Sequence, residues 1–258
     1  TIPSLRGKYR SRTMNSLVMD AERLCEKGVK ELILVAQDTA LYGKDLYGRS
    51  MLHELLRKLS KIEELEWIRI LYCYPENITD ETINEMAENK KVCHYIDMPI
   101  QHRNDGILKK MGRKSSREEL KAVIGKLGGK VHDIIIRPTL IVGFPGETEE
   151  DFEELVNFVK EVRFDRLGIF TYSKEDGTPA AKMPDQIDED IKNSRKECIL
   201  ELQKSISSEK CSSYIGKVFK VLVEGRLSED EVYCGRTYMD TYEIDGMVFF
   251  ESEDDILA

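Results

Sequence analysis

The stretch that decides the fold is residues 141–148, which read IVGFPGET. A largely apolar run, residues 134–142, ends in this stretch, and an acidic segment, residues 149–154, follows it directly. This order is typical of a buried strand that passes through a tight turn into a helix N-terminus. The glycines and the proline of the turn let backbone amides approach a ligand without side chains in the way. An ordinary strand–helix loop looks the same, so both interpretations stay open.

The same alternation of strand and helix repeats on both sides of this junction. Strands are expected at residues 31–36, 67–72, 94–100, 133–142 and 167–172, and helices at 15–27, 51–59, 79–88, 105–111, 116–127 and 147–162. Such repetition predicts a parallel sheet with right-handed crossovers, either open and doubly wound or a barrel of the TIM type. In both folds the chemistry belongs at the C-terminal ends of the strands.

The pattern changes in the last third of the chain. Residues 188–214 predict a long polar helix, whose apolar stripe is Ile191, Ile199, Leu202 and Ile206. After Gly216, strands are expected at 217–224 and 247–250, with a turn-rich segment at 233–242 between them. This order predicts a small all-β module. From Lys217 onward four Lys or Arg stand against eleven Asp or Glu, so the module is a poor candidate for binding phosphates.

The charge, the apolar runs and the cysteines of the chain exclude several classes of function. The net charge of −9 in 258 residues argues against broad adhesion to nucleic acid, which is therefore not an expected partner. No run approaches the ~18–20 apolar residues of a membrane span, and no signal peptide opens the chain, so neither a membrane nor secretion is expected. The six cysteines have no close pair, which indicates reduced thiols in a cytoplasmic protein and no metal site. The first residue is Thr1, which indicates a processed or cropped segment.

Two charged residues interrupt strands that are otherwise apolar. Asp97 lies near the end of the strand at 94–100, and Arg137 divides the strand at 133–142. A charge in a buried strand is costly unless it is paired or used, so a structural Arg–Asp pair and contact with a ligand are both open. His102, which follows the strand at 94–100, is either a general base or a hydrogen-bonded loop residue. The basic segment 6–12 is either a solvated arm or a loop that faces an anion.

Several segments resemble one enzyme family, the radical S-adenosylmethionine methylthiotransferases. The segments are LVAQDTALYG at 34–43, DMPIQH at 97–102, RPTLIVGFPGETEEDF at 137–152 and YSKEDGTPAAKMPDQI at 172–187. The tail GRTYMDTYEIDG at 235–246 is similar to the TRAM module that ends those enzymes. The resemblance covers essentially the whole chain in the right order. It implies an α/β fold, a partial TIM-type barrel with a C-terminal helix over residues 1–214, followed by a small all-β TRAM module over 215–258.

The family has two branches, which differ in substrate. One modifies an adenosine of transfer RNA, and the other modifies an aspartate of the twelfth small-subunit ribosomal protein. The triplet 37–39 (Gln-Asp-Thr), the pair Gln101-His102 and Arg137 follow the ribosomal-protein branch. The acidic tail also fits a basic ribosomal protein as partner. The expected activity is addition of a methylthio group to the β-carbon of that aspartate. A transfer-RNA methylthiotransferase and a non-catalytic acidic scaffold remain as alternatives.

By resemblance, S-adenosylmethionine lies across the C-terminal ends of the strands. The implied cofactor-binding residues are Gln37, Asp38, Thr39, Pro99, Gln101, Val142, Gly143 and Tyr172. Arg137 would reach a carboxylate of the cofactor or the substrate, and Asp97 lies in the ribose region; both are the implied catalytic residues.

The resemblance also implies two 4Fe–4S clusters and a reductant for the intact protein. The cysteines that hold the radical-generating cluster would directly precede Thr1, and none of the six cysteines present replaces them. The first barrel strand and the last strands of the TRAM module are likewise expected to lie outside the chain. The chain alone is therefore expected to be inactive and to provide no metal ligand.

Overall fold

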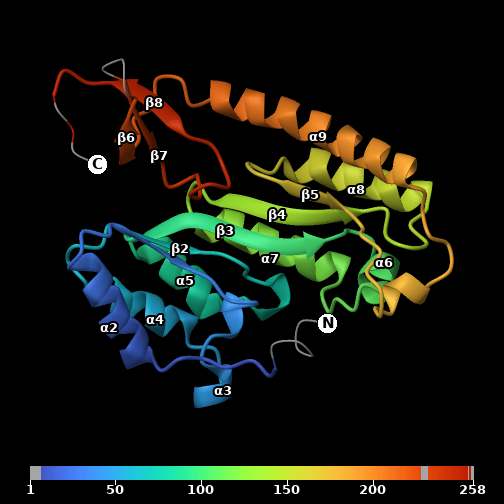
Figure 1. Ribbon diagram of the computed structural model, residues 1–258, viewed down its shortest axis with the longest axis horizontal. Coiled ribbons are helices and arrows are strands. Elements are labelled where there is room, and N and C mark those ends of the chain that lie inside the picture. The colour runs from blue at the N-terminus through green and yellow to red at the C-terminus, as the bar shows by residue number, and fades with distance from the viewer. Residues whose placement is uncertain (1–6, 228–231, 255, 257–258) are drawn as a thin grey trace.

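Five parallel strands form the larger sheet of the computed structural model, which describes residues 7–227, 232–254 and 256 (Figure 1). The strands pair in chain order, and they are β1 (Glu31–Leu34), β2 (Trp67–Ile70), β3 (Val92–Gln101), β4 (Ile135–Val142) and β5 (Gly168–Thr171). A doubly wound sheet reverses its strand order at a switch point, whereas the wall of a barrel does not. The sequential order therefore confirms the partial barrel among the two folds that the sequence left open.

The helices follow the strands as the alternation predicts. They are α2 (Met14–Cys25), α3 (Lys44–Tyr47), α4 (Leu52–Leu59), α5 (Asp80–Glu88), α6 (Asp105–Lys110), α7 (Arg117–Lys130), α8 (Glu149–Val162) and α9 (Glu189–Ser212), with short 3-10 turns at Thr39–Leu41, Pro75–Asn77 and Ala180–Lys182. Side chains of Thr79, Ser116 and Thr148 cap the amides of the first turns of α5, α7 and α8. These caps fix where the polypeptide leaves each loop.

Alternate residues of the central strands point to opposite faces of the sheet. One face packs against the helices and forms the main hydrophobic core, to which Ile68, Ile96 and Leu140 contribute. The other face, called the open face here, carries Trp67 and Tyr95 in a smaller cluster with Met239. This second cluster joins the barrel to the C-terminal module, because Met239 belongs to that module.

The C-terminal module is a three-stranded antiparallel sheet of β6 (Leu222–Arg226), β7 (Val232–Arg236) and β8 (Val248–Glu251). The expectation of a turn-rich segment at 233–242 is wrong for its first residues, which form β7. Gly235 permits this pairing, because a Cβ there would lie 2.5 Å from the Leu222 carbonyl oxygen. Residues 237–246, called the docking turn here, connect β7 to β8 and reach the sheet of the barrel (Figure 1).

Helix α9 departs from the predicted apolar stripe. Ile199 and Ile206 are buried as expected, but the Ile191 side chain is 48% exposed. Lys192 and Arg195 are buried instead. The reason is local, because these two basic side chains reach polar and glycine positions at the end of β4.

Candidate functional site

The three residues of the triplet 37–39, which follow β1, differ in their exposure to solvent. Gln37 is exposed, whereas Asp38 and Thr39 are buried. The Thr39 hydroxyl donates to the Leu71 carbonyl oxygen at 2.8 Å. Asp38 accepts hydrogen bonds from the amides of Ala40 and Tyr74 and from the Asn77 side chain, at 3.1, 3.3 and 2.6 Å. Thus Asp38 and Thr39 hold the loop, and Gln37 alone presents a free polar side chain.

Burial raises the pKa of Asp38 above its ordinary value, although three donated hydrogen bonds lower it in part. The folded protein therefore binds this proton more readily than the unfolded chain does. It follows that the stability contributed by Asp38 is fully present below the unfolded pKa and is lost as pH rises through the folded pKa.

Asp38→Asn tests this linkage. We expect the wild type to gain stability relative to the variant when the pH is lowered from about 7 to about 4, a window that spans the ordinary carboxyl range. Urea unfolding at both pH values measures the difference. Asp45→Asn is the control with the opposite sign, because hydrogen bonds from Ser11 lower the pKa of Asp45. An Asp38 difference that does not change with pH would contradict the expectation.

Asp97 and Arg137 form an ion pair on the open face. Arg137 Nη1 donates to Asp97 Oδ1 at 2.7 Å, and Arg137 Nε lies 3.3 Å from Asp245 Oδ1 of the docking turn. Burial alone would lower the pKa of Arg137, but the charges of Tyr95, Asp97 and Asp245 raise it. The structure shows the structural pair that the sequence left open. Two carboxylates neutralise the guanidinium, and a catalytic function of Arg137 and Asp97 stays a prediction.

Three further predicted residues lie at the ends of β3 and β5. The Pro99 carbonyl oxygen accepts a hydrogen bond from Arg113 at 2.6 Å. Gln101 has a positive φ of 74°, and its Oε1 atom is buried without a hydrogen-bond partner. The hydroxyl of Tyr172 is also buried without a partner. Unpaired buried polar atoms are costly in a folded protein, and a bound ligand or a water molecule can supply the missing partner.

The backbone amides of two glycines in the turn of residues 141–148 form hydrogen bonds within the protein. The Val142 side chain is fully buried against the helices, so only its backbone could contact a ligand. The Gly143 amide donates to Glu147 Oε2 at 2.9 Å, and the Gly146 amide donates to the Asp185 carbonyl oxygen at 2.9 Å. These two amides therefore have partners within the protein, as in the ordinary strand–helix loop that the sequence left open. Cofactor binding at Val142 and Gly143 stays a prediction.

Gly143 is required for packing as well as for its positive φ of 74°. A Cβ there would lie 2.3 Å from Cγ of the buried Lys192. Gly143→Ala should lower the free energy of unfolding by about 2–4 kcal/mol, from the left-handed backbone and overpacking together. Gly177→Ala is the control, since Gly177 has a similar φ of 78° with open space around it. Equal losses in urea unfolding would contradict the packing argument.

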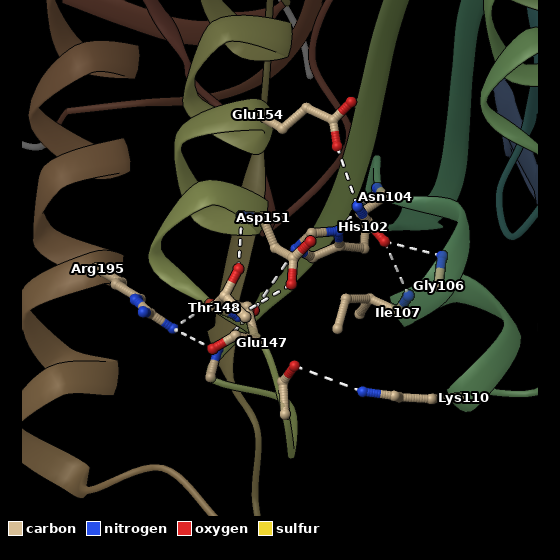
Figure 2. Close-up of polar contacts among 12 residues, drawn as sticks. His102, Asn104, Gly106, Ile107, Lys110, Glu147, Thr148, Asp151, Glu154 and Arg195 are labelled. Atoms are coloured by element: carbon tan, nitrogen blue, oxygen red, sulfur yellow. Dashed lines mark hydrogen bonds and ion pairs between the residues drawn. The ribbon is translucent and has the colours of Figure 1, made fainter. Parts of the chain in front are cut away.

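A buried polar cluster that was not predicted from the sequence lies behind this turn (Figure 2). Glu147 Oε1 pairs with Arg195 Nη1 at 2.7 Å, and both side chains are almost fully buried. His102 is fully buried and its Nδ1 accepts the Asn104 amide at 3.0 Å, so a neutral ring carries its proton on Nε2. That nitrogen lies 3.5 Å from Glu147 Oε2. His102 is therefore a hydrogen-bonded loop residue, which is one of the two interpretations that the sequence left open.

The cluster ties three separated elements together. Glu147 follows β4, Arg195 lies on α9, and His102 follows β3. Asn104 caps α6 and also donates to Glu154 of α8 at 3.1 Å. The signal that could have located the cluster was the pair of basic residues within the apolar stripe of α9.

In the described part of the basic segment 6–12, Tyr9, Ser11 and Arg12 contact the rest of the protein, and Arg12 Nη2 pairs with Asp20 at 2.6 Å. Lys8 and Arg10 are exposed, and Arg6 lies outside the described residues. The Tyr9 hydroxyl donates to the Asp38 carbonyl oxygen at 3.2 Å, and the Ser11 amide donates to Asp45 at 2.8 Å. Among the described residues no group of three or more His, Cys, Asp or Glu side chains could hold a metal ion. Within the same residues, no helix combines the length and the apolar character needed to cross a membrane.

Curated relatives match the chain along its full length. It is 54% identical over 257 residues to the ribosomal protein uS12 methylthiotransferase RimO of Lachnoclostridium phytofermentans, covering 100% of this chain and 58% of the relative. It is 51% identical to RimO of Clostridium botulinum, covering 99% of this chain and 57% of that relative. The chain thus spans a little under three fifths of the length of these two proteins.

Solved structures show the same fold at low identity. Methylornithine synthase (PylB) matches with a TM-score of 0.53 and 14% identity, over 77% of this chain and 54% of that chain. Coproporphyrinogen III oxidase (HemN) from Escherichia coli, described as a radical SAM enzyme, matches with a TM-score of 0.51 and 20% identity, over 81% and 49%.

Two family models match separate parts of the chain. The TRAM domain model matches residues 215–257, which contain the antiparallel module. The radical SAM superfamily model matches residues 1–159, well over half of the 258 residues. The chain therefore belongs to the radical SAM superfamily.

Proposed function

We propose that the intact protein adds a methylthio group to the β-carbon of an aspartate in ribosomal protein uS12, in the cytoplasm. The observation that carries this proposal is the 54% identity, over the whole chain, to a relative named for that activity. Three further curated relatives, at 50–52% identity, carry the same name, and this favours uS12 over a transfer-RNA substrate.

The ends of the strands fit S-adenosylmethionine as the cofactor. Gln37 is exposed there, and Gln101 Oε1 and the Tyr172 hydroxyl are buried without protein partners. A nucleoside with hydroxyl groups and an ammonium offers the donors and acceptors that these atoms lack. When bound, S-adenosylmethionine supplies the radical chemistry that removes hydrogen from the substrate.

The residues of this chain position that site and keep it rigid. Asp38 holds the loop that carries Gln37, and Glu147 holds the turn after β4 through the Gly143 amide. Gln101, the last residue of β3, has a left-handed conformation and directly precedes the buried His102. A site whose loops are held by internal hydrogen bonds does not need to reorganise when the cofactor binds.

Two 4Fe–4S clusters and an external reductant complete the proposal for the intact protein. The described residues contain no set of ligands for a cluster, so no step is assigned to these groups here. The acidic C-terminal module supplies a surface of suitable charge for a basic ribosomal protein. Binding of that substrate through the module is part of the proposal.

The experiment compares two substrates for the intact, cluster-reconstituted enzyme. With a reductant and S-adenosylmethionine, ribosomal protein uS12 should gain one methylthio group on a single aspartate, read by peptide mass spectrometry. Transfer RNA should gain none. Tyr172→Phe, which removes only the unpartnered hydroxyl, should weaken cofactor binding several-fold, about the effect of one lost hydrogen bond. Modification of transfer RNA instead of uS12 would overturn the proposal.

A further inference from the structure

Tyr72 is an unusual residue at the end of β2. It has a positive φ of 54°, which is costly for a residue with a Cβ, and its side chain is 48% exposed at the end of the strand. Its amide donates to Asp97 Oδ2 at 3.0 Å, and the Cys73 amide donates to the Asp97 carbonyl oxygen at 2.9 Å. Asp97 therefore holds the backbone of this strand end in place. Strained conformations of this kind persist only where the surroundings fix them.

Asp97 is linked to the C-terminal module through Arg137. Its other oxygen, Oδ1, accepts from Arg137 Nη1 at 2.7 Å, and Arg137 Nε lies 3.3 Å from Asp245 Oδ1. Asp245 Oδ2 accepts from the Tyr95 hydroxyl at 2.7 Å and from the Thr241 amide at 3.0 Å. The side chains of Asp97 and Asp245 are only 5% and 4% exposed, so solvent screens these contacts weakly.

We infer that Asp245 is a positioning residue, which acts through Arg137 and Asp97 on the backbone of Tyr72. Asp245 fixes one end of the Arg137 guanidinium, and the other end then directs Asp97 toward the Tyr72 amide. Without the Asp245 carboxylate, Arg137 has one anionic partner and can rotate, so Asp97 loses its fixed direction. The C-terminal module thereby contributes to the geometry of the cofactor-facing end of the barrel, besides any contact that it makes with a substrate.

A second ion pair between the same turn and the barrel provides a matched comparison. Arg166 pairs with Asp240 Oδ1 at 2.5 Å, and Asp240 is as buried as Asp245. Among the described residues, neither Arg166 nor Asp240 contacts Asp97 or Tyr72 directly, although Asp240 Oδ1 also accepts the Gly246 amide at 3.2 Å. Asp245→Asn and Asp240→Asn both remove one carboxylate charge between the two modules, but only the first variant is expected to affect the end of β2.

Hydrogen–deuterium exchange of the chain, without cofactor or substrate, tests the inference. In Asp245→Asn the peptide that spans residues 71–74 should exchange about tenfold faster, the effect of losing one charge-assisted hydrogen bond. In Asp240→Asn its rate should stay within about twofold of the wild type. Fluorescence of Trp67, the single tryptophan, verifies that the docking turn remains packed on the open face.

Tyr95→Phe keeps the inference testable if Asp245→Asn fails to fold. It removes only the hydroxyl that Asp245 accepts, so a smaller increase, about threefold, is expected in the same peptide. Equal exchange in the Asp245 and Asp240 variants, or no increase in Tyr95→Phe, would overturn the inference.

The kinetic consequence rests on the proposed function. In the intact enzyme, Asp245→Asn should lower kcat/KM for uS12 by about tenfold through kcat, whereas Asp240→Asn should leave it within about twofold. If the wild-type enzyme modifies no uS12, the proposed function fails, while the exchange experiment still decides the function of Asp245. If both variants lose the same activity, Asp245 is merely structural.

Discussion

Glu31→Ala is expected to detach the C-terminal module from the barrel and to lower the free energy of unfolding by about 3–5 kcal/mol. Glu31 Oε1 pairs with Arg69 Nε at 2.7 Å, and Oε2 pairs with Arg236 Nη2 at 2.6 Å. Both guanidinium groups are almost fully buried. Arg69 belongs to β2 and Arg236 to β7, so Glu31 joins two buried guanidinium groups from two modules. Arg236 also pairs with Glu224 at 2.5 Å and keeps that carboxylate in the variant, whereas Arg69 loses its ion pair. Among the described residues, removal of the Glu31 carboxylate leaves Arg69 with the Tyr238 carbonyl oxygen as its remaining hydrogen-bond acceptor.

The measurement is urea unfolding followed by the fluorescence of Trp67, which lies in the cluster that joins the two modules. Emission should shift to longer wavelength at a lower urea concentration, because solvent reaches Trp67 once the docking turn leaves. Glu66→Ala is the control, since Glu66 also links the barrel to the C-terminal segment, through Lys220, but both side chains are exposed. That variant should lose less than about 1 kcal/mol. Similar losses in the two variants would show that burial of Glu31 does not matter.

The elements of the barrel could be predicted because their signals are local. Apolar runs located the strands to within a few residues, and Thr79 marks the start of α5 as predicted. The order of the strands in the sheet depends on pairing between distant segments. The sequence therefore could not distinguish a doubly wound sheet from a barrel. The strand β7 was missed because Gly235 and the polar residues beside it resemble a turn, whereas pairing with β6 decides the structure.

The candidate site could be predicted less well, because its polar contacts join residues far apart in sequence. Asp97 and Arg137 could be named as a possible pair, but only the register of β3 against β4 places them side by side. Glu31 and Arg236 have the sequence pattern of ordinary surface charges, and their burial depends on the docking of a module some 200 residues later in the chain. In the same way, Lys192 and Arg195 lie on a polar helix, and only the glycine and the glutamate after β4 explain why they are buried.

Glu147→Ala is expected to have the second large effect, a loss of about 3–5 kcal/mol, together with loosening of the turn at residues 141–148. Glu147 is the fully buried centre of the cluster in Figure 2, where it binds Arg195, faces His102 and accepts the Gly143 amide. Alanine leaves a buried guanidinium and a buried amide without these partners. Arg195 keeps its contact with Glu149, which is 66% exposed and therefore compensates little.

Two variants separate the charge of Glu147 from its hydrogen bonds. Glu147→Gln keeps the shape and one acceptor oxygen, so its loss in urea unfolding should be about half that of alanine. Glu149→Ala, at the first residue of α8, should cost less than about 1 kcal/mol because its carboxylate is largely in water. Hydrogen exchange at Gly143 should rise in Glu147→Ala and remain unchanged in Glu149→Ala, since only Glu147 accepts that amide. If the Gly143 amide stayed protected in Glu147→Ala, another acceptor would hold it, and the cluster would not be what fixes the turn.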